Sequence, residues 1–174
     1  MIYFTADTHF WHTNILRYCP RRKEVFGDIE TMNDAFIDTI NASVKPNDTL
    51  YHLGDFCWSA VKTGSIRQRI KCRKIHVVRG NHDSSSLRSH VSSMDHMVFL
   101  KNPKMHLCHY PLASWGGQFY GGYHLHGHCH GRLKLQELEN HSVARSMDVG
   151  VDAIFNRIGE WRPISIDEVI EILE

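Results

Sequence analysis

Acidic, amide and imidazole side chains recur in five short clusters along the chain. These clusters read DTH, GD, GNHD, CHYP and GHCH, and their metal-competent members are Asp7, His9, Asp55, Asn81, His109, His128 and His130. Mixed carboxylate and imidazole ligands suit manganese, iron, zinc or nickel better than calcium or a thiolate zinc finger. The chain also carries 14 histidines in 174 residues. This abundance indicates a metal site or acid–base chemistry.

The spacing within two of these clusters favours shared ligation. In an extended segment, side chains at positions i and i+2 point the same way. The pattern therefore predicts that Asp7 and His9 bind one ion together, and that His128 and His130 do the same. The residues between them are expected to point away from the ion.

The charge of such a site suits a phosphate group. Asp7 and Asp55 supply two negative charges, whereas Asn81 and the four imidazoles supply none. Two divalent cations would leave the site at about +2 before a bridging hydroxide lowers that value. The whole chain has a net charge of only +1, so its affinity for anions must be local.

Each cluster follows a segment that reads as a strand. The strands are predicted at residues 1–7, 49–55, 74–80, 104–110 and 121–131. In open α/β sheets, ligands bind outside the carboxyl ends of the strands. We therefore expect five strands to deliver their metal-competent groups to one edge.

The other segments predict an α/β sandwich with a mixed sheet core. Apolar residues at helical spacing predict an amphipathic helix over residues 31–44. Further elements are expected as helices at 65–72 and 165–174 and as strands at 97–100 and 145–152. Residues 11–30 read as a long polar connection, and such connections often form functional lids.

The bulk properties indicate a single domain over residues 1–174. This length suits one sizeable core, and 42% of the residues are hydrophobic. No apolar run is long enough for a membrane helix, and the N-terminus lacks the features of a signal peptide. The five cysteines form no CxxC pair, which favours reduced thiols and a cytoplasmic location.

The order of the clusters resembles the calcineurin-like metallophosphoesterase superfamily, in a small single-domain branch of prokaryotic or phage type. The pattern DxH, GD, GNH followed by an acid, a lone His and GHxH is matched from position 7 to position 130. The resemblance implies a four-layer α-β-β-α sandwich with two packed mixed sheets. It also implies a metal-dependent phosphoesterase acting on monoesters or diesters.

The resemblance further implies a dinuclear centre with two divalent metal ions. Manganese is the first candidate, and iron, zinc and nickel are the alternatives. The ligands of one ion would be Asp7, His9, Asp55 and His130. The ligands of the other would be Asp55, Asn81, His109 and His128. A hydroxide bridging the two ions would attack phosphorus in line.

His82 is the candidate general acid that protonates the leaving oxygen. Its neighbour Asp83 would either orient the imidazole and favour its protonated form, or cap the helical stretch that follows. These alternatives stay open from the sequence.

Five further residues are candidates for supporting roles. His12 and Arg17 could contact the substrate, although a solvated loop position is an alternative for each. Arg22 has the same two interpretations. Asp148 and Asp152 could anchor a ligand histidine from behind.

The expected partner is a small phosphoester, for which a nucleotide-like compound is one candidate, and neither a membrane nor a long nucleic acid. A second hypothesis is a catalytically weak metal-binding scaffold that binds a partner protein. A structural zinc protein is a third, but the set of seven ligands exceeds a closed tetrad.

Overall fold

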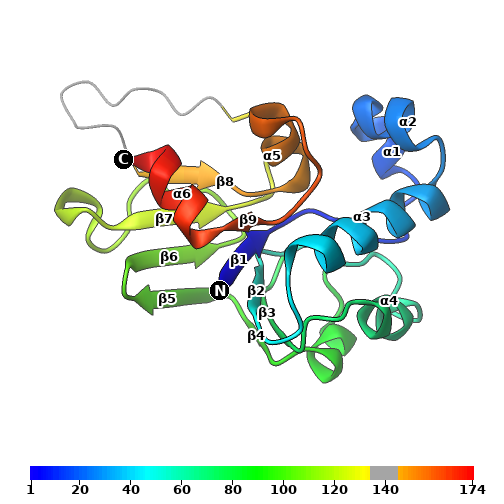
Figure 1. The fold of residues 1–174 in the computed structure, drawn as a ribbon, viewed down its shortest axis with the longest axis horizontal. Coiled ribbons are helices and arrows are strands. Elements are labelled where there is room, and N and C mark those ends of the chain that lie inside the picture. Colours follow the sequence, from blue (N-terminus) through cyan, green and yellow to red (C-terminus); the bar gives the residue numbers. More distant parts are fainter. Residues whose placement is uncertain (134–144) are drawn as a thin grey trace.

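The computed structural model describes residues 1–133 and 145–174, and its strands form two mixed sheets (Figure 1). The five-stranded sheet has the order β4–β3–β2–β1–β9, with strands Ser93–Asp95, Lys74–Val78, Thr49–His52, Ile2–Thr5 and Ile164–Ser165. The four-stranded sheet has the order β5–β6–β7–β8, with strands Met97–Lys101, Lys104–Cys108, Tyr123–His126 and Ser146–Asp148. Pairing is parallel apart from the antiparallel pairs β1–β9 and β5–β6 in the described part of the chain. The predicted α/β class with two packed mixed sheets is confirmed.

Six α-helices are described, and they are α1 Ile15–Tyr18, α2 Pro20–Phe26, α3 Ile29–Ser43, α4 Thr63–Arg69, α5 Val151–Ile158 and α6 Ile166–Leu173. The amphipathic helix expected over residues 31–44 is α3, whose first turn is capped by Asp28 through the Thr31 amide. Helix α6 begins with a capping box between Ser165 and Glu168, so Ser165 is its N-cap residue. None of the described helices is long and apolar enough to cross a membrane.

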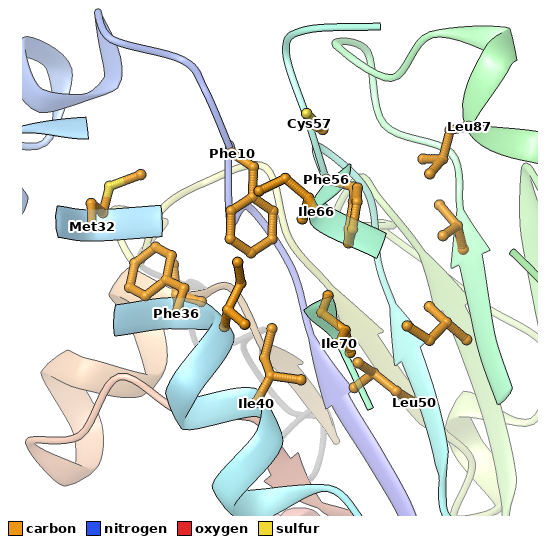
Figure 2. Close-up of a cluster of buried hydrophobic side chains, with 14 of the residues drawn as sticks. Phe10, Met32, Phe36, Ile40, Leu50, Phe56, Cys57, Ile66, Ile70 and Leu87 are labelled. Carbon is orange, nitrogen blue, oxygen red and sulfur yellow. The ribbon is translucent and has the colours of Figure 1, made fainter. Parts of the chain in front are cut away.

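Two hydrophobic cores lie on the two faces of the five-stranded sheet. Helices α1 to α4 cover one face, and Figure 2 shows Met32, Phe36 and Ile40 of α3 in one cluster with Phe10 and Leu50. The other face packs against the four-stranded sheet, and α5 and α6 add apolar side chains to this second core. Alternation along each strand divides its residues between the two cores, as a doubly covered sheet requires.

The segment 11–30 differs from the polar lid that the sequence predicts. It contains α1, α2 and the start of α3, and Ile15 and Leu16 are buried in the first core. Its apolar residues are separated by a run of charged residues, which hides two short helices from a periodicity argument. The segment is therefore part of the packed layer, and its fixed position matters for the site.

A buried histidine on β7 makes the stability of the fold depend on pH. His124 is fully buried, the Leu112 amide donates to its Nε2 atom at 3.0 Å, and its Nδ1 atom lies 3.1 Å from the His106 carbonyl oxygen. Both contacts require the neutral ring with its proton on Nδ1. Burial lowers the pKa of His124 to about 4.

We expect the stability of the protein to fall as the pH drops from 6.5 toward 4. In that window the unfolded chain protonates His124 and the folded chain does not, so this group removes about 1.4 kcal/mol of unfolding free energy per pH unit. Urea unfolding of the apo protein at a series of pH values measures the slope. His124→Gln should show a shallower slope, and His96→Gln, at an exposed position, is the matched control. Equal slopes for the wild type and His124→Gln would contradict the prediction.

Candidate metal centre

The five sequence clusters converge where the two sheets meet. Clusters after β1, β2 and β3 come from one sheet, and clusters after β6 and β7 come from the other. Their ligand atoms form two groups, each with all atoms within 4.8 Å of one another. The first group is Asp7, His9 and His130, and the second is Asp55, His109 and His128.

Asp55 lies between the two groups. Its Oδ2 atom is 3.5 Å from Nε2 of His9 and also 3.5 Å from Nε2 of His109. Its other carboxylate oxygen accepts the backbone N–H of His82 at 2.9 Å, which fixes the orientation of the carboxylate. A single oxygen thus faces a histidine of each group.

The backbone of the ligand turns corrects the prediction drawn from strand alternation. Positive φ angles occur at five ligand residues, which are Asp7 (57°), His9 (50°), Asp55 (56°), His128 (69°) and His130 (50°). These residues lie in left-handed turns beyond the strand ends, so the i, i+2 rule for extended chains does not apply. In the structure His128 and His130 lie in different groups, whereas Asp7 and His9 lie in the same one.

The GD and GNHD clusters require their glycines because atoms of neighbouring segments lie too close to leave room for a side chain. A Cβ atom on Gly80 would lie 2.2 Å from Oδ1 of Asp55 and 2.4 Å from its backbone nitrogen. A Cβ atom on Gly54 would lie 2.5 Å from Nδ1 of His109, and Gly54 has a φ of +97°. Any side chain at these positions would displace a ligand residue.

The electrostatics of the groups fit divalent cations. Burial raises the pKa of Asp7 well above its ordinary value, and the nearby carboxylates of Asp148 and Asp55 raise it further. Burial, then the charge of Arg22, holds the pKa of His9 well below its ordinary value, so the ring is neutral. Among the described residues, Nε2 of His9 has no hydrogen-bond partner. Buried carboxylates beside an imidazole nitrogen without a hydrogen-bond partner form a donor set that suits a cation.

A buried ion pair supports the first group from behind. Asp152 accepts two hydrogen bonds from the Arg22 guanidinium, at 2.9 Å and 2.6 Å, and its Oδ2 atom lies 2.6 Å from Nδ1 of His130. Arg22 also donates to the backbone carbonyls of Asp7 and Thr8. Burial opposes ionisation of Asp152, but Arg22 and His130 outweigh it and hold the carboxyl pKa well below its ordinary value. The pair therefore fixes His130 relative to the DTH turn.

The contacts of Arg22, Asp152 and Asp148 decide between the alternative roles that the sequence predicts for these residues. Arg22 is fully buried, so it neither contacts the substrate nor lies on a solvated face, and its role in the ion pair was not predicted from the sequence. Asp152 anchors a ligand histidine as predicted. Asp148 instead accepts the amides of Gly131 and Gly150 and so holds the turn after His130. Arg17 is exposed on α1, and its contact with substrate stays a prediction.

Cys19, His130 and Asp152 form a third group of metal-competent atoms. Burial and the neighbouring Asp152 raise the pKa of the Cys19 thiol to about 11, so the sulfur keeps its proton. Asp152 is already occupied by Arg22, and the group shares His130 with the first one. The trio is therefore support for His130 rather than a separate metal site.

The structure corrects both interpretations of Asp83. The buried carboxylate accepts three backbone amides, those of Asp55, Phe56 and Gly80, at 2.8–2.9 Å. Among the described residues it makes no hydrogen bond to the His82 ring, and Ser84 caps the following 3₁₀ turn. Asp83 thus joins the GD turn to the GNHD loop, a role hidden from sequence because its partners are backbone groups.

His12 lies behind a ligand rather than in a solvated loop. It is 7% exposed, and its Nδ1 atom is 3.1 Å from Nδ1 of His9. Its ring stacks on Trp58 with centroids 4.1 Å apart and planes 9° apart. This contact orients His9, so that its Nε2 atom faces Asp55.

The fold and the site define a class of proteins in which two mixed sheets present carboxylate and imidazole ligands at their strand ends. The chain belongs to the calcineurin-like phosphoesterase family, which it matches over residues 1–162. This is a family of metal-dependent phosphoesterases, and the candidate His and Asp groups agree with it.

Similar proteins cover nearly the whole chain. Protein MJ1445 of Methanocaldococcus jannaschii, described as uncharacterized, is 30% identical over 175 residues, which span 99% of this chain and 91% of that protein. The crystal structure of AQ665 from Aquifex aeolicus, a protein of unknown function, aligns with a TM-score of 0.69 and 23% identity over 99% and 98% of the two chains. The nuclease MPE of Pseudomonas putida aligns with a TM-score of 0.41 and 22% identity over 74% of this chain and 61% of the nuclease. The AQ665 alignment supports the fold alone.

Gly80→Ala should weaken metal binding by at least tenfold, because the new methyl group meets the Asp55 carboxylate and backbone. Calorimetric titration of the apo protein with Mn²⁺ measures the affinity. Gly159→Ala is the control, since a Cβ there meets no atom within 4 Å and its positive φ adds only backbone strain far from the ligand turns. Unchanged affinity in Gly80→Ala would show that the close approach does not shape the site.

Asp152→Asn should lower both stability and metal affinity. It leaves the Arg22 charge buried without its anion, which costs about 3–5 kcal/mol of unfolding free energy. It also weakens the contact that orients His130, so Mn²⁺ affinity should fall about 10- to 100-fold. Urea unfolding and Mn²⁺ titration measure the two effects, and Asp38→Asn, exposed on α3, is the control. A destabilised variant with wild-type affinity would refute the positioning role.

Proposed function

We propose that this protein hydrolyses phosphoesters at a dinuclear centre formed by the two ligand groups. The observation that carries the proposal is the Asp55 oxygen at 3.5 Å from a histidine of each group. When bound, two divalent ions would supply an activated water and positive charge for the phosphate oxygens. Manganese is the first candidate, with iron, zinc and nickel as alternatives that the same donor types accept.

The two groups and the position of Asp55 support one ligand set for each ion. One ion would be held by Asp7, His9, His130 and Asp55. The other would be held by Asp55, His109, His128 and Asn81. Asn81 is assigned to the second ion because its Oδ1 atom lies 3.1 Å from Nε2 of His109.

We assign to His82 the donation of a proton to the leaving oxygen, and its surroundings support this role. Its backbone amide is tied to Asp55, while its side chain is exposed with its ring centroid 5.5 Å from that of His9. The imidazole therefore borders the ligand groups and still reaches solvent. A proton donor at this place can neutralise the alkoxide or phenoxide as the ester bond breaks.

The surroundings of the centre support a small substrate. Asn81, His82 and His128 are all exposed, which makes the site open to solvent from one side. The net charge of +1 does not favour binding of a long polyanion. The reaction proposed is therefore hydrolysis of a small monoester or diester.

Turnover of phosphoesters that differ in their leaving groups tests this proposal. The Mn²⁺-loaded protein should hydrolyse p-nitrophenyl phosphate or bis-p-nitrophenyl phosphate, and also the corresponding phenyl esters. His82→Gln should lose about 10²–10⁴-fold in kcat on the phenyl ester, whose leaving oxygen needs a proton. The loss should be smaller on the nitrophenyl ester, because nitrophenolate leaves without one.

The matched control is Asp55→Asn, with bound manganese measured in the same samples. This variant should lose metal as well as turnover, whereas His82→Gln should keep its metal. Wild-type protein that binds two Mn²⁺ per chain and hydrolyses none of these esters would refute the proposal and support the scaffold hypothesis.

A further inference from the structure

Exposed aromatic side chains border both ligand groups. Trp58 is 51% exposed, and its ring lies 4.1 Å from that of His12 and 5.0 Å from that of His82. Tyr110 is 44% exposed and contacts the two histidines of the second group, His109 at 5.0 Å and His128 at 4.7 Å. Large aromatic rings left in solvent beside a polar site are a feature of ligand recognition.

Trp58 forms a fixed platform rather than a mobile surface residue. His12 covers the indole with nearly parallel planes and is itself buried and held against His9. The Trp58 backbone amide donates to the Phe10 carbonyl at 2.9 Å, which ties the segment to the first core. About half of the side chain stays in solvent, available for stacking by a flat group.

Tyr110 is held by contacts with the second ligand group, whereas Trp58 is held by His12. Both ligand histidines meet it at steep angles, 73° for His109 and 64° for His128. Its hydroxyl lies 3.5 Å from Oδ1 of Asn81, at the outer side of the second group. The ring thus stands next to the metal ligands and leaves part of its surface to solvent.

The positions of the two rings beside the candidate centre suit a nucleotide whose phosphate binds there. In a nucleotide, one sugar ring separates the phosphate from the base. In this site, the imidazoles of His12 and His82 lie between Trp58 and His9, whereas the Tyr110 ring contacts His109 and His128 directly. A phosphate at the metal centre would therefore place an attached nucleoside beside Trp58 or Tyr110.

We propose that Trp58 and Tyr110 select phosphodiesters that carry a nucleoside or a comparable flat ring. The inference rests on the proposed function, since it assigns the substrate class of the same centre. Stacking tolerates any base, because every base offers a π-face. The selectivity expected is thus for nucleosides over alkyl groups, without strong preference among bases.

Two diesters with one leaving group test the inference. Thymidine 5′-(p-nitrophenyl phosphate) and ethyl p-nitrophenyl phosphate release the same phenol, so the ratio of their kcat/KM values reports recognition of the nucleoside. The wild-type ratio should favour the thymidine ester. Trp58→Leu or Tyr110→Leu should reduce that ratio by about 5- to 150-fold, the range for loss of one stacked base.

Conservative variants separate recognition from folding. Trp58→Phe and Tyr110→Phe keep a ring and should retain most of the ratio, and bound manganese is measured in every variant. Tyr120→Leu is the matched control, because Tyr120 is 84% exposed and, among the described residues, its ring contacts no ligand histidine.

The outcomes also separate this inference from the proposed function. Hydrolysis of both esters with a wild-type ratio near one, or a ratio that neither leucine variant lowers, overturns the inference and leaves phosphoester hydrolysis intact. Absence of turnover of both diesters by the Mn²⁺-loaded wild type overturns the inference, and it overturns the proposed function as well only when p-nitrophenyl phosphate is not hydrolysed either. A ratio lowered equally by Tyr120→Leu would place the recognition elsewhere and also overturn it.

Discussion

The structure depends on the compensation of carboxylates buried where the two sheets meet. Asp83 is satisfied by three backbone amides, and Asp152 by the guanidinium of Arg22. Asp7 and Asp55 have only partial compensation from protein groups, and the pKa of Asp7 is raised by burial and by its acidic neighbours. Burial of a charge without a partner is strongly unfavourable. The fold thus leaves negative charge only partly compensated at the position where neutral imidazoles gather. Divalent cations bound there would compensate it.

The sequence predicted which candidate ligands converge better than it predicted the backbone geometry of the turns that carry them. Residue types and order were sufficient for the metal-competent groups, because the strand ends of an α/β sheet converge whatever their exact turns. The pairing of His128 with His130 by strand alternation does not match the two groups, whereas the division implied by the resemblance does; alternation assumed an extended backbone, while both residues have positive φ angles. Such turns are imposed by close contacts between segments far apart in sequence, as at Gly80 and Asp55. No local pattern encodes those contacts.

The supporting residues were the hardest to predict, for a related physical reason. Arg22 lies in a run of basic residues that reads as a solvated face, yet its guanidinium is fully buried. Its partner Asp152 is 130 residues away in the chain. The helices α1 and α2, which the sequence presented as a polar connection, are what carry Arg22 into the interior. A buried ion pair can be inferred from neither partner alone, because each one by itself would be costly to bury.

The centre separates the groups suited to chemistry from those suited to recognition. The ligand turns are fixed from behind by Arg22, Asp152 and Asp83, through contacts that exclude solvent. Trp58 and Tyr110 lie on the solvent side, where a substitution changes exposed surface more than core packing. His12 links the two sides, because it orients His9 and also supports the Trp58 ring. Members of a fold can therefore keep the ligand turns and change the bordering aromatic residues, since only the former are locked into the two cores.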